Sequence, residues 1–130
     1  MPVSFSQIQV GESYSRHQLA ALWGYSSFHA IARGIVTPKD DDKIILFITE
    51  EKQESAEQYE DSLRDGRLRC EGPTDHFGER RILSAGSSGD QIYLFYRNRH
   101  HSDFEYVGKL ALRSHKVAVD KPTKFEFEII

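Results

Sequence analysis

The order of hydrophobic and polar positions along the chain predicts a sheet protein with few helices. The most apolar run, residues 43–49, reads KIILFIT and has the length of a strand that is buried on both faces. We therefore expect this strand at the centre of the sheet. Five further runs alternate between apolar and polar positions, as half-buried strands do: residues 67–71, 92–96, 104–108, 109–119 and 124–130.

Two helices are predicted from capping and spacing. Ser15 is a favourable N-cap with Gln18 three residues later, as in a capping box, and an apolar stripe that includes Trp23 follows before Gly24 ends the helix. We expect Trp23 in the core. A second short helix is predicted over residues 76–85, where apolar side chains recur at helical spacing. Three other segments are predicted as a short edge strand (3–11), an extended stretch (28–38) and a short helix or structured loop (50–65).

Together these elements predict an α+β fold in a single domain over residues 1–130: a curled, mostly antiparallel mixed sheet with two or three helices. The 38% hydrophobic and 28% charged residues are typical of a soluble globular protein, and no apolar run approaches the roughly 18 residues of a membrane span. The N-terminus does not resemble a signal peptide, and Cys70, the one cysteine, excludes an internal disulfide. We therefore expect a cytoplasmic protein that does not bind a membrane.

The charge distribution leaves room for a local basic surface. The formal net charge is -3, which argues against indiscriminate binding to nucleic acid. Residues 1–61 carry five basic and ten acidic side chains, whereas residues 62–130 carry twelve basic and ten acidic ones. The second half of the chain can therefore present a basic patch on an acidic domain.

Residues 90–108 are the stretch that most favours binding. Two aromatic runs flank the basic segment RNRHH, and the polar connection predicts a hairpin with Arg97, Arg99, His100 and His101 at its tip. Aromatic rings for stacking and cations for phosphate are the two ingredients of nucleic-acid binding. The alternative for the same stretch is a core strand followed by a solvated loop.

A second set of residues fits the recognition of a base. Tyr59 and Asp61 come after the apolar strand, and Glu71 follows shortly. A ring and a carboxylate at the mouth of a pocket can stack on a base and accept hydrogen bonds from its exocyclic amine. The alternative is that Tyr59 packs on its own helix and that both carboxylates are solvated.

Most other chemistries lack their motifs. Scattered histidines and one cysteine give no zinc-ligand pairs, so no metal or other cofactor is expected, and neither a GxxxxGK loop nor a GxSxG elbow is present. One layout does match metal-dependent nucleases: acidic residues 40–42, then Glu50, Glu51 and Lys52 about ten residues later. We interpret these groups as a hairpin turn and a solvated strand exit.

Eight short motifs stand in an order that is found in one known family. They are GIVTPK (34–39), IILFITEEKQ (44–53), QYED (58–61), CEG (70–72), ERRIL (79–83), GDQIYLFYR (89–97), HHSDF (100–104) and YVGK (106–109). In this order they resemble the SRA-like (DUF3427-type, PUA-like) reader domain, which is fused to helicase or HNH nuclease modules in modification-dependent restriction enzymes. The resemblance covers roughly residues 14–119.

The resemblance implies a PUA/SRA-like β-barrel that binds duplex DNA with a modified base, 5-methylcytosine or a relative, and flips that base into a pocket. Tyr59, Asp61 and Gly72 stand where true SRA domains place this pocket. Relatives carry a tryptophan at the position of Cys70, so the aromatic cage is either incomplete or filled from elsewhere, with Tyr96 and Tyr106 as candidates. Contacts to the DNA backbone are expected from Arg33, Lys39, Arg97, Arg99, His100, His101 and Lys109.

We therefore expect a non-catalytic reader of modified DNA, the targeting module of a restriction system whose nuclease or helicase lies in a fused module or a partner chain. Three alternatives stay open. They are a PUA-like domain that binds modified RNA, the metal-dependent nuclease outlined above, and a module that binds a small molecule or a protein.

Overall fold

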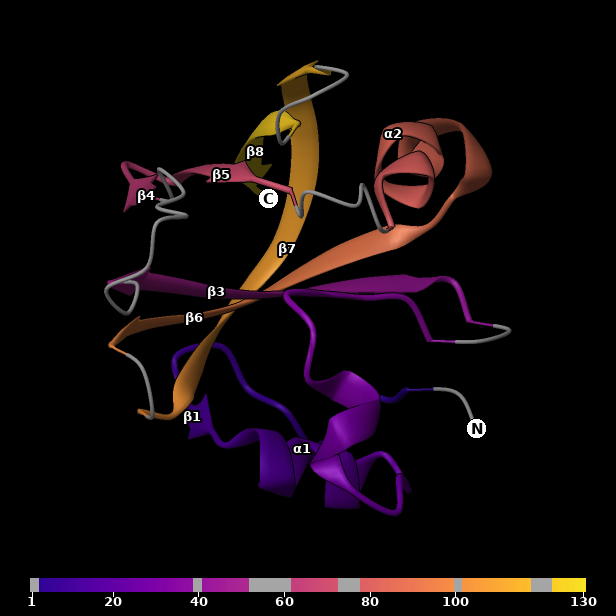
Figure 1. Ribbon diagram of the computed structural model, residues 1–130, viewed down its shortest axis with the longest axis vertical. Helices are drawn as coiled ribbons and strands as arrows, with labels where there is room; N and C mark the ends of the chain where they lie inside the picture. Colours follow the sequence, from indigo (N-terminus) through magenta and orange to yellow (C-terminus); the bar gives the residue numbers. More distant parts are fainter. Residues whose placement is uncertain (1–2, 39–40, 52–61, 73–77, 100–101, 118–122) are drawn as a thin grey trace.

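One curled sheet with helices on both of its faces makes up the protein (Figure 1). The computed structural model describes residues 3–38, 41–51, 62–72, 78–99, 102–117 and 123–130. Its elements follow in the order β1 (Ser13–Tyr14), α1 (Arg16–Leu22), the 3₁₀ helix η1 (Phe28–Ile31), β2 (Ile35–Val36), β3 (Lys43–Glu51), β4 (Ser62–Arg64), β5 (Arg67–Glu71), α2 (Glu79–Ser88), β6 (Gln91–Arg99), β7 (Phe104–Lys116) and β8 (Lys124–Ile129). No helix in these ranges is long and apolar enough to cross a membrane.

The strand order is β2-β3-β6-β7-β8-β5-β4, with β1 paired to β7, and it confirms the predicted mixed sheet. Among the described strands β3 and β6 form the single parallel pair, and the remaining pairs are antiparallel. The end strands β2 and β4 do not pair with each other, so the described sheet is curled but not closed into a barrel. The prediction that residues 43–49 lie at the centre is wrong. Strand β7 takes that place because its 13 residues pair with β6, β8 and β1.

The sheet separates two apolar cores. The α1 core joins α1 and η1 to one face and contains, among others, Trp23, Ile31, Phe47, Phe95 and Phe104. The α2 core joins α2 to the other face through Ile82 and Ala85, which pack on residues of β3, β5, β6, β7 and β8. Successive residues of β3 alternate between the two cores, and residues 44–49 are all buried. The prediction that this strand is buried on both faces is therefore confirmed.

Helix α1 begins as predicted, whereas the segment before it does not form a strand. The Ser15 side chain accepts from the Gln18 backbone and the Gln18 side chain accepts from the Ser15 backbone, which completes the capping box, and Trp23 is 3% exposed. Residues 3–11 form turns instead of the expected edge strand. Val3, Phe5 and Ile8 pack into the α1 core, where the Phe5 ring stacks on Tyr93 with centroids 4.0 Å apart.

The two strands predicted at 104–108 and 109–119 are one continuous strand, β7. Gly108 lies at their expected junction with a φ of 132°, and the register with β6 shifts between Leu94 and Phe95. Such a bulge inserts one extra residue and bends the strand without ending it, and glycine adopts the required backbone conformation easily. The sequence signal for a break therefore marks a bend.

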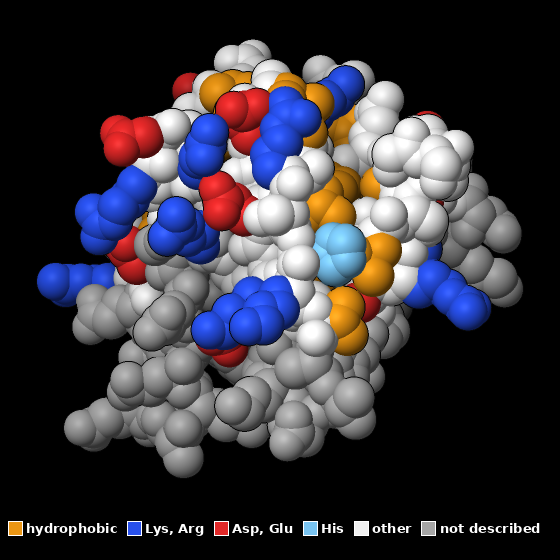
Figure 2. Space-filling model, turned by 90° about the horizontal axis from the view of Figure 1, so that it is seen from above, with side chains coloured by type: hydrophobic (Ala, Val, Ile, Leu, Met, Phe, Trp, Pro, Cys, Tyr) orange, Lys and Arg blue, Asp and Glu red, His pale blue; other side chains and the backbone are white. Residues whose placement is uncertain are grey.

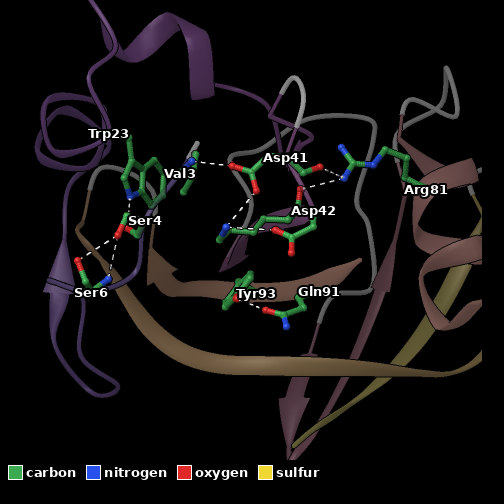
Figure 3. A network of polar contacts seen from close by, with 10 residues as sticks. Val3, Ser4, Ser6, Trp23, Asp41, Asp42, Arg81, Gln91 and Tyr93 are labelled. Atoms are coloured by element: carbon green, nitrogen blue, oxygen red, sulfur yellow. Dashed lines mark hydrogen bonds and ion pairs between the residues drawn. The ribbon is translucent and has the colours of Figure 1, made fainter. Parts of the chain in front are cut away.

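A polar network joins the N-terminal segment, the start of β3 and α2 (Figure 3). The Asp41 carboxylate accepts from the Val3 backbone N–H at 2.6 Å and from Lys43 Nζ at 3.0 Å. Arg81 of α2 donates to the backbone oxygen of Asp41 at 2.9 Å, and Asp42 also contacts Lys43. The acidic turn before β3 is thus used to hold the fold together.

Candidate nucleic-acid interface

The carboxyl-terminal ends of β3 and β6 lie side by side, and β7 begins next to them (Figure 1). Thr49 of β3 and Arg97 of β6 are register partners in the parallel pair. Because alternate residues share a face, Thr49 follows Phe47 on the α1 side of the sheet, and Arg97 follows Phe95. Phe104, the first residue of β7, is buried on the same side. The aromatic part of the α1 core is therefore followed, at this edge of the sheet, by the polar Thr49 and the positively charged Arg97.

Arg97 is held in one orientation by uncharged partners. Its Nε donates to Oγ1 of Thr49 at 2.7 Å, and its Nη1 donates to the backbone oxygen of Ser102 at 3.1 Å. Its Cζ lies 4.2 Å from the centroid of the Phe104 ring, which is a cation–π distance. Burial lowers the pKa of Arg97. The hairpin residue that the sequence predicted to contact DNA is therefore partly shielded and firmly positioned.

A second guanidinium, that of Arg16, lies over the same ring. Its Cζ is 4.9 Å from the Phe104 centroid and 4.7 Å from the Phe47 centroid. Its Nε donates to the backbone oxygen of Ile31 at 3.0 Å, and its Nη2 donates to that of Arg33 at 3.3 Å. Helix α1 and the segment around η1 thus bring a cation to the end of β3 and β6.

Sequence reasoning did not identify Arg16. Burial, and after it repulsion from Arg97, lowers the pKa of Arg16 to about 10, so the side chain stays charged at neutral pH. Arg16 is the first residue of α1, where the helix macrodipole disfavours a cation, and the first turn contains no acidic residue. A basic residue at the first position of a helix, where a positive charge is unfavourable, is the sequence signal that could have identified Arg16 as a candidate site residue.

The face that carries β4, β5 and β8 has a different charge pattern. Figure 2 shows Lys and Arg side chains on this face with Asp and Glu side chains between them. Arg67 of β5 contacts Glu126 of β8 at 3.2 Å, and Arg113 of β7 contacts Glu128 of β8 at 2.6 Å. The hydrogen bond from Arg113 lowers the pKa of Glu128. These arginines are therefore already paired with carboxylates.

A cleft of about 370 Å³ opens at the β6–β7 hairpin. It brings together two predicted backbone-binding residues, Arg97 and Arg99, and one predicted pocket residue, Tyr96. The remaining lining residues are Ser13, Asn98, Ser102, Asp103 and Glu105. The cleft is thus polar, with charges of both signs and one aromatic ring.

The other residues predicted to contact the DNA backbone do not gather at this cleft. Arg33 is exposed in the turn before β2. Lys109 is exposed on β7, five residues beyond Phe104 and therefore about 17 Å along the strand. Lys39, His100 and His101 lie outside the described residues.

The residues predicted to line a base pocket lie on different faces. Tyr96 packs against the α2 core, to which β5 contributes Cys70, and Glu71 is the half-buried last residue of β5. Tyr106 is 6% exposed in the α1 core, and burial, followed by the charge of Tyr93, raises the pKa of Tyr106 to about 12. The structure therefore places Tyr96 on the face that carries β5 and keeps Tyr106 apart from it. Tyr59 and Asp61 lie outside the described residues.

A buried polar pair lies directly behind Gly72. Thr123 is fully buried and donates a short hydrogen bond to the carboxylate of Glu79, which is 5% exposed. The Gly72 backbone N–H donates to the backbone oxygen of Thr123 at 2.8 Å. A Cβ atom at position 72 would lie 2.8 Å from Oε2 of Glu79 and 3.1 Å from the Phe125 ring. Gly72, which stands at the position of an SRA pocket glycine, is therefore required by packing, because a larger side chain would collide with Glu79 and Phe125.

The groups of the nuclease alternative are not brought together among the described residues. Asp41 and Asp42 precede β3, whereas Glu50 lies near its end, so about 25–30 Å of strand separates them. Asp40 and Lys52 lie outside the described residues. In the described part of the chain, no three His, Cys, Asp or Glu side chains form a group that could hold a metal.

Comparison with known proteins identifies the fold. No family model and no curated protein match the chain. The SRA domain of SUVH5 in complex with hemimethylated CG DNA matches with a TM-score of 0.68 and 15% identity, over 100% of this chain and 94% of that one. Its complex with fully methylated CG DNA gives 0.63 and 14%, with coverage of 100% and 94%. The DNA modification-dependent restriction endonuclease AspBHI gives 0.63 and 16%, with coverage of 100% and 80%. The predicted SRA-like fold is therefore confirmed.

Proposed function

We propose that this protein is a reader domain that binds duplex DNA carrying a modified base. The observation that carries the proposal is the match of the whole chain to SRA domains that were solved with methylated CG DNA. The similarity to a modification-dependent restriction endonuclease supports a role in targeting a restriction system. The nuclease or helicase of that system would lie in a fused module or a partner chain.

The cationic edge at the β6–β7 hairpin is the surface that we assign to the DNA backbone. Arg97 and Arg99 line the cleft there, and Arg97 is fixed by hydrogen bonds, so a phosphate would meet an ordered guanidinium. Phosphate contacts set the register of the duplex without reading its sequence. Arg33, Lys39, His100, His101 and Lys109 are proposed as further contacts along the same duplex.

The base pocket is proposed on the β5 side of the sheet. In the sequence Tyr59 and Asp61 come shortly before β4, and Glu71 is the last residue of β5. Tyr96 packs against the α2 core, to which β5 also contributes. In this arrangement an aromatic ring stacks on a flipped base and a carboxylate accepts from its exocyclic amine. The burial of Tyr106 in the α1 core makes it the weaker candidate for this cage.

Base flipping limits how strongly a single methyl group can be recognised. Extrusion of the base costs a few kcal/mol of stacking, which stacking and hydrogen bonds in the pocket must offset. A methyl group buried against an apolar wall contributes about 1 kcal/mol, or about five-fold in affinity. We therefore expect moderate selectivity for 5-methylcytosine or a relative, and no catalysis by this domain itself.

The test is a fluorescence-anisotropy titration with short duplexes that differ in one base: cytosine, 5-methylcytosine, 5-hydroxymethylcytosine or N6-methyladenine. Each is measured at two salt concentrations, with an RNA duplex of the same sequence beside them. We expect one modified DNA duplex to bind several-fold more tightly than its unmodified match. Equal affinity for all DNA duplexes would mean that the protein binds the DNA backbone and has no pocket for a modified base. Tighter binding to the RNA duplex would mean that the protein recognises RNA instead.

Variants separate the pocket from the backbone surface. Tyr59→Ala and Asp61→Ala are expected to remove the preference for the modified duplex while unmodified DNA binds as before. Arg99→Ala is expected to weaken all duplexes alike and to reduce the salt dependence. If both pocket variants keep the preference, the pocket has been assigned to the wrong residues.

A further inference from the structure

Arg16 and Arg97 form a pair of like charges at the end of the α1 core. Their Cζ atoms lie 4.9 and 4.2 Å from one point, the centroid of the Phe104 ring. The distance between the two Cζ atoms therefore cannot exceed the sum of these two values. Such a distance is comparable to the Debye length of about 8 Å at physiological salt, so the charges are only partly screened from each other. The two cations therefore repel each other, and this repulsion is, after burial, the second cause of the lowered pKa of Arg16.

Within the described chain no carboxylate lies within ion-pair distance of either guanidinium. Arg16 donates to two backbone oxygens, and Arg97 donates to one backbone oxygen and one hydroxyl. None of the ion pairs between described residues includes either side chain. Arg113, in contrast, contacts Glu128. Two partly buried cations without a counterion are unfavourable for the fold, so an external anion would relieve both.

Both guanidinium groups have donors left for such an anion. Each carries five N–H groups, of which Arg16 uses those on Nε and Nη2, and Arg97 uses those on Nε and Nη1. No buried side-chain nitrogen of the described residues lacks a hydrogen-bond partner. The unused nitrogens, Nη1 of Arg16 and Nη2 of Arg97, must therefore reach solvent, from which an anion can approach.

We propose that Arg16 and Arg97 together bind one phosphodiester group, with both guanidinium groups packed against the Phe104 ring. A phosphodiester carries one negative charge on two unesterified oxygens, so each oxygen can accept from one guanidinium. The backbone contacts to Ile31, Arg33 and Ser102 hold the two donors in place before the anion arrives. The identification of DNA as the source of the phosphate rests on the proposed function, since a free phosphate has the same chemistry.

The first test measures duplex affinity against salt for Arg16→Gln, Arg97→Gln and the double variant. Arg113→Gln is the matched control, because Arg113 is an exposed arginine with its own carboxylate partner. Each single variant is expected to weaken modified and unmodified duplexes about ten-fold, and the control to change neither. The slope of log Kd against log salt counts neutralised phosphates, so the double variant should lose about one phosphate and not two. A loss of two would overturn the shared site.

The second test uses the wild-type protein without relying on any variant to fold. The arginine Nε–H signals are followed by NMR during titration with inorganic phosphate and, separately, with a duplex. We expect the Arg16 and Arg97 signals to shift and the Arg113 signal to stay. If no duplex binds but phosphate shifts both signals, the reader function fails and the anion site stands with free phosphate as its ligand. If duplexes bind but neither titration shifts these signals, the site is wrong and the reader function stands.

Discussion

Nε of Arg97 donates to Oγ1 of Thr49 at 2.7 Å, across the parallel pair β3–β6. Thr49 is 7% exposed at the end of a strand whose preceding residues are apolar. A buried hydroxyl at this place therefore has one evident partner, the guanidinium of the neighbouring strand. Thr49 is a positioning residue, because it contacts Arg97 and not the proposed ligand.

Replacement of Thr49 by valine removes the acceptor and keeps the shape of the side chain. We expect Thr49→Val to weaken all duplexes about five-fold, since Arg97 loses one of the two bonds that orient it, while the free energy of unfolding changes little. Thr49→Ser retains the hydroxyl and should bind as the wild type does. Fluorescence anisotropy on the three proteins checks this. Wild-type affinity in the valine variant would mean that Arg97 is oriented without the hydroxyl.

A methyl group at position 72 should destabilise the protein. The Cβ atom of Gly72→Ala would lie 2.8 Å from a carboxylate oxygen of Glu79, which is buried and bonded to Thr123 and so cannot move freely. We expect the free energy of unfolding to fall by about 1–3 kcal/mol. Gly86→Ala is the control, because Gly86 lies inside α2 with open space around it. It should stabilise the protein by up to about 1 kcal/mol, and urea unfolding measures both.

The two tyrosines considered for the aromatic cage should differ in their effect on stability. Tyr106 lies in the α1 core with its ring centroid 5.2 Å from that of Phe95, so Tyr106→Ala is expected to lower the free energy of unfolding by about 3–5 kcal/mol. Tyr96→Ala should lower it less, because Tyr96 is half-buried. Fluorescence of Trp23, the one tryptophan, reports unfolding in both. A stable Tyr106→Ala variant that loses selectivity for modified DNA would instead place Tyr106 in the pocket.

Acid should weaken the polar network at the start of β3. Burial would raise the pKa of Asp41, but hydrogen bonds from the Val3 backbone and Lys43 outweigh it and lower the pKa below its ordinary 3.8. A carboxylate with a lowered pKa stabilises the fold above its unfolded value, and this contribution disappears as the pH falls through the folded value. Urea unfolding between pH 7 and pH 2 should show the loss below about pH 4.

Asp41→Asn provides the control for the acid effect. The amide retains an oxygen for the Val3 N–H but loses the charge that faces Lys43. We expect the variant to be less stable than the wild type at pH 7, by about 1–3 kcal/mol, and to lose less stability in acid. Parallel acid dependence in both proteins would assign the effect to other carboxylates.

Much of the fold could be predicted because its signals are local. The capping box at Ser15 and the alternation of residues 67–71 each depend on neighbours within a few positions, and α1 and β5 are found there. Residues 3–11 were predicted wrongly, because Phe5 is placed by its stack on the distant Tyr93 and not by its neighbours. The end of α2 was also missed, since Gly86 stays helical and Gly89, at a φ of 85°, ends the helix.

The same distinction applies to the candidate site. Arg97 was predicted because it stands between aromatic runs in a hairpin, which is visible in the sequence alone. Arg16 could not be predicted in the same way, because its partner, the Phe104 ring, is distant in the sequence and is brought close only by the fold. A predicted pair, Tyr96 and Tyr106, is separated because the register shift near Gly108 and the strand alternation place the two rings against different cores.

The open sheet also has consequences for association between copies of the chain. Any unclosed sheet exposes backbone donors and acceptors at its two ends, and these can template pairing with another molecule. Here the end strands β2 and β4 have two and three residues, so each offers very little unpaired backbone. The long strands β6 and β7 lie between other long strands, whereas β3 is covered on its outer edge only where β2 pairs with Ile45 and Leu46. Among the described strands, the backbone that could pair with another molecule is therefore the outer edge of β3 beyond Phe47, and not the short end strands.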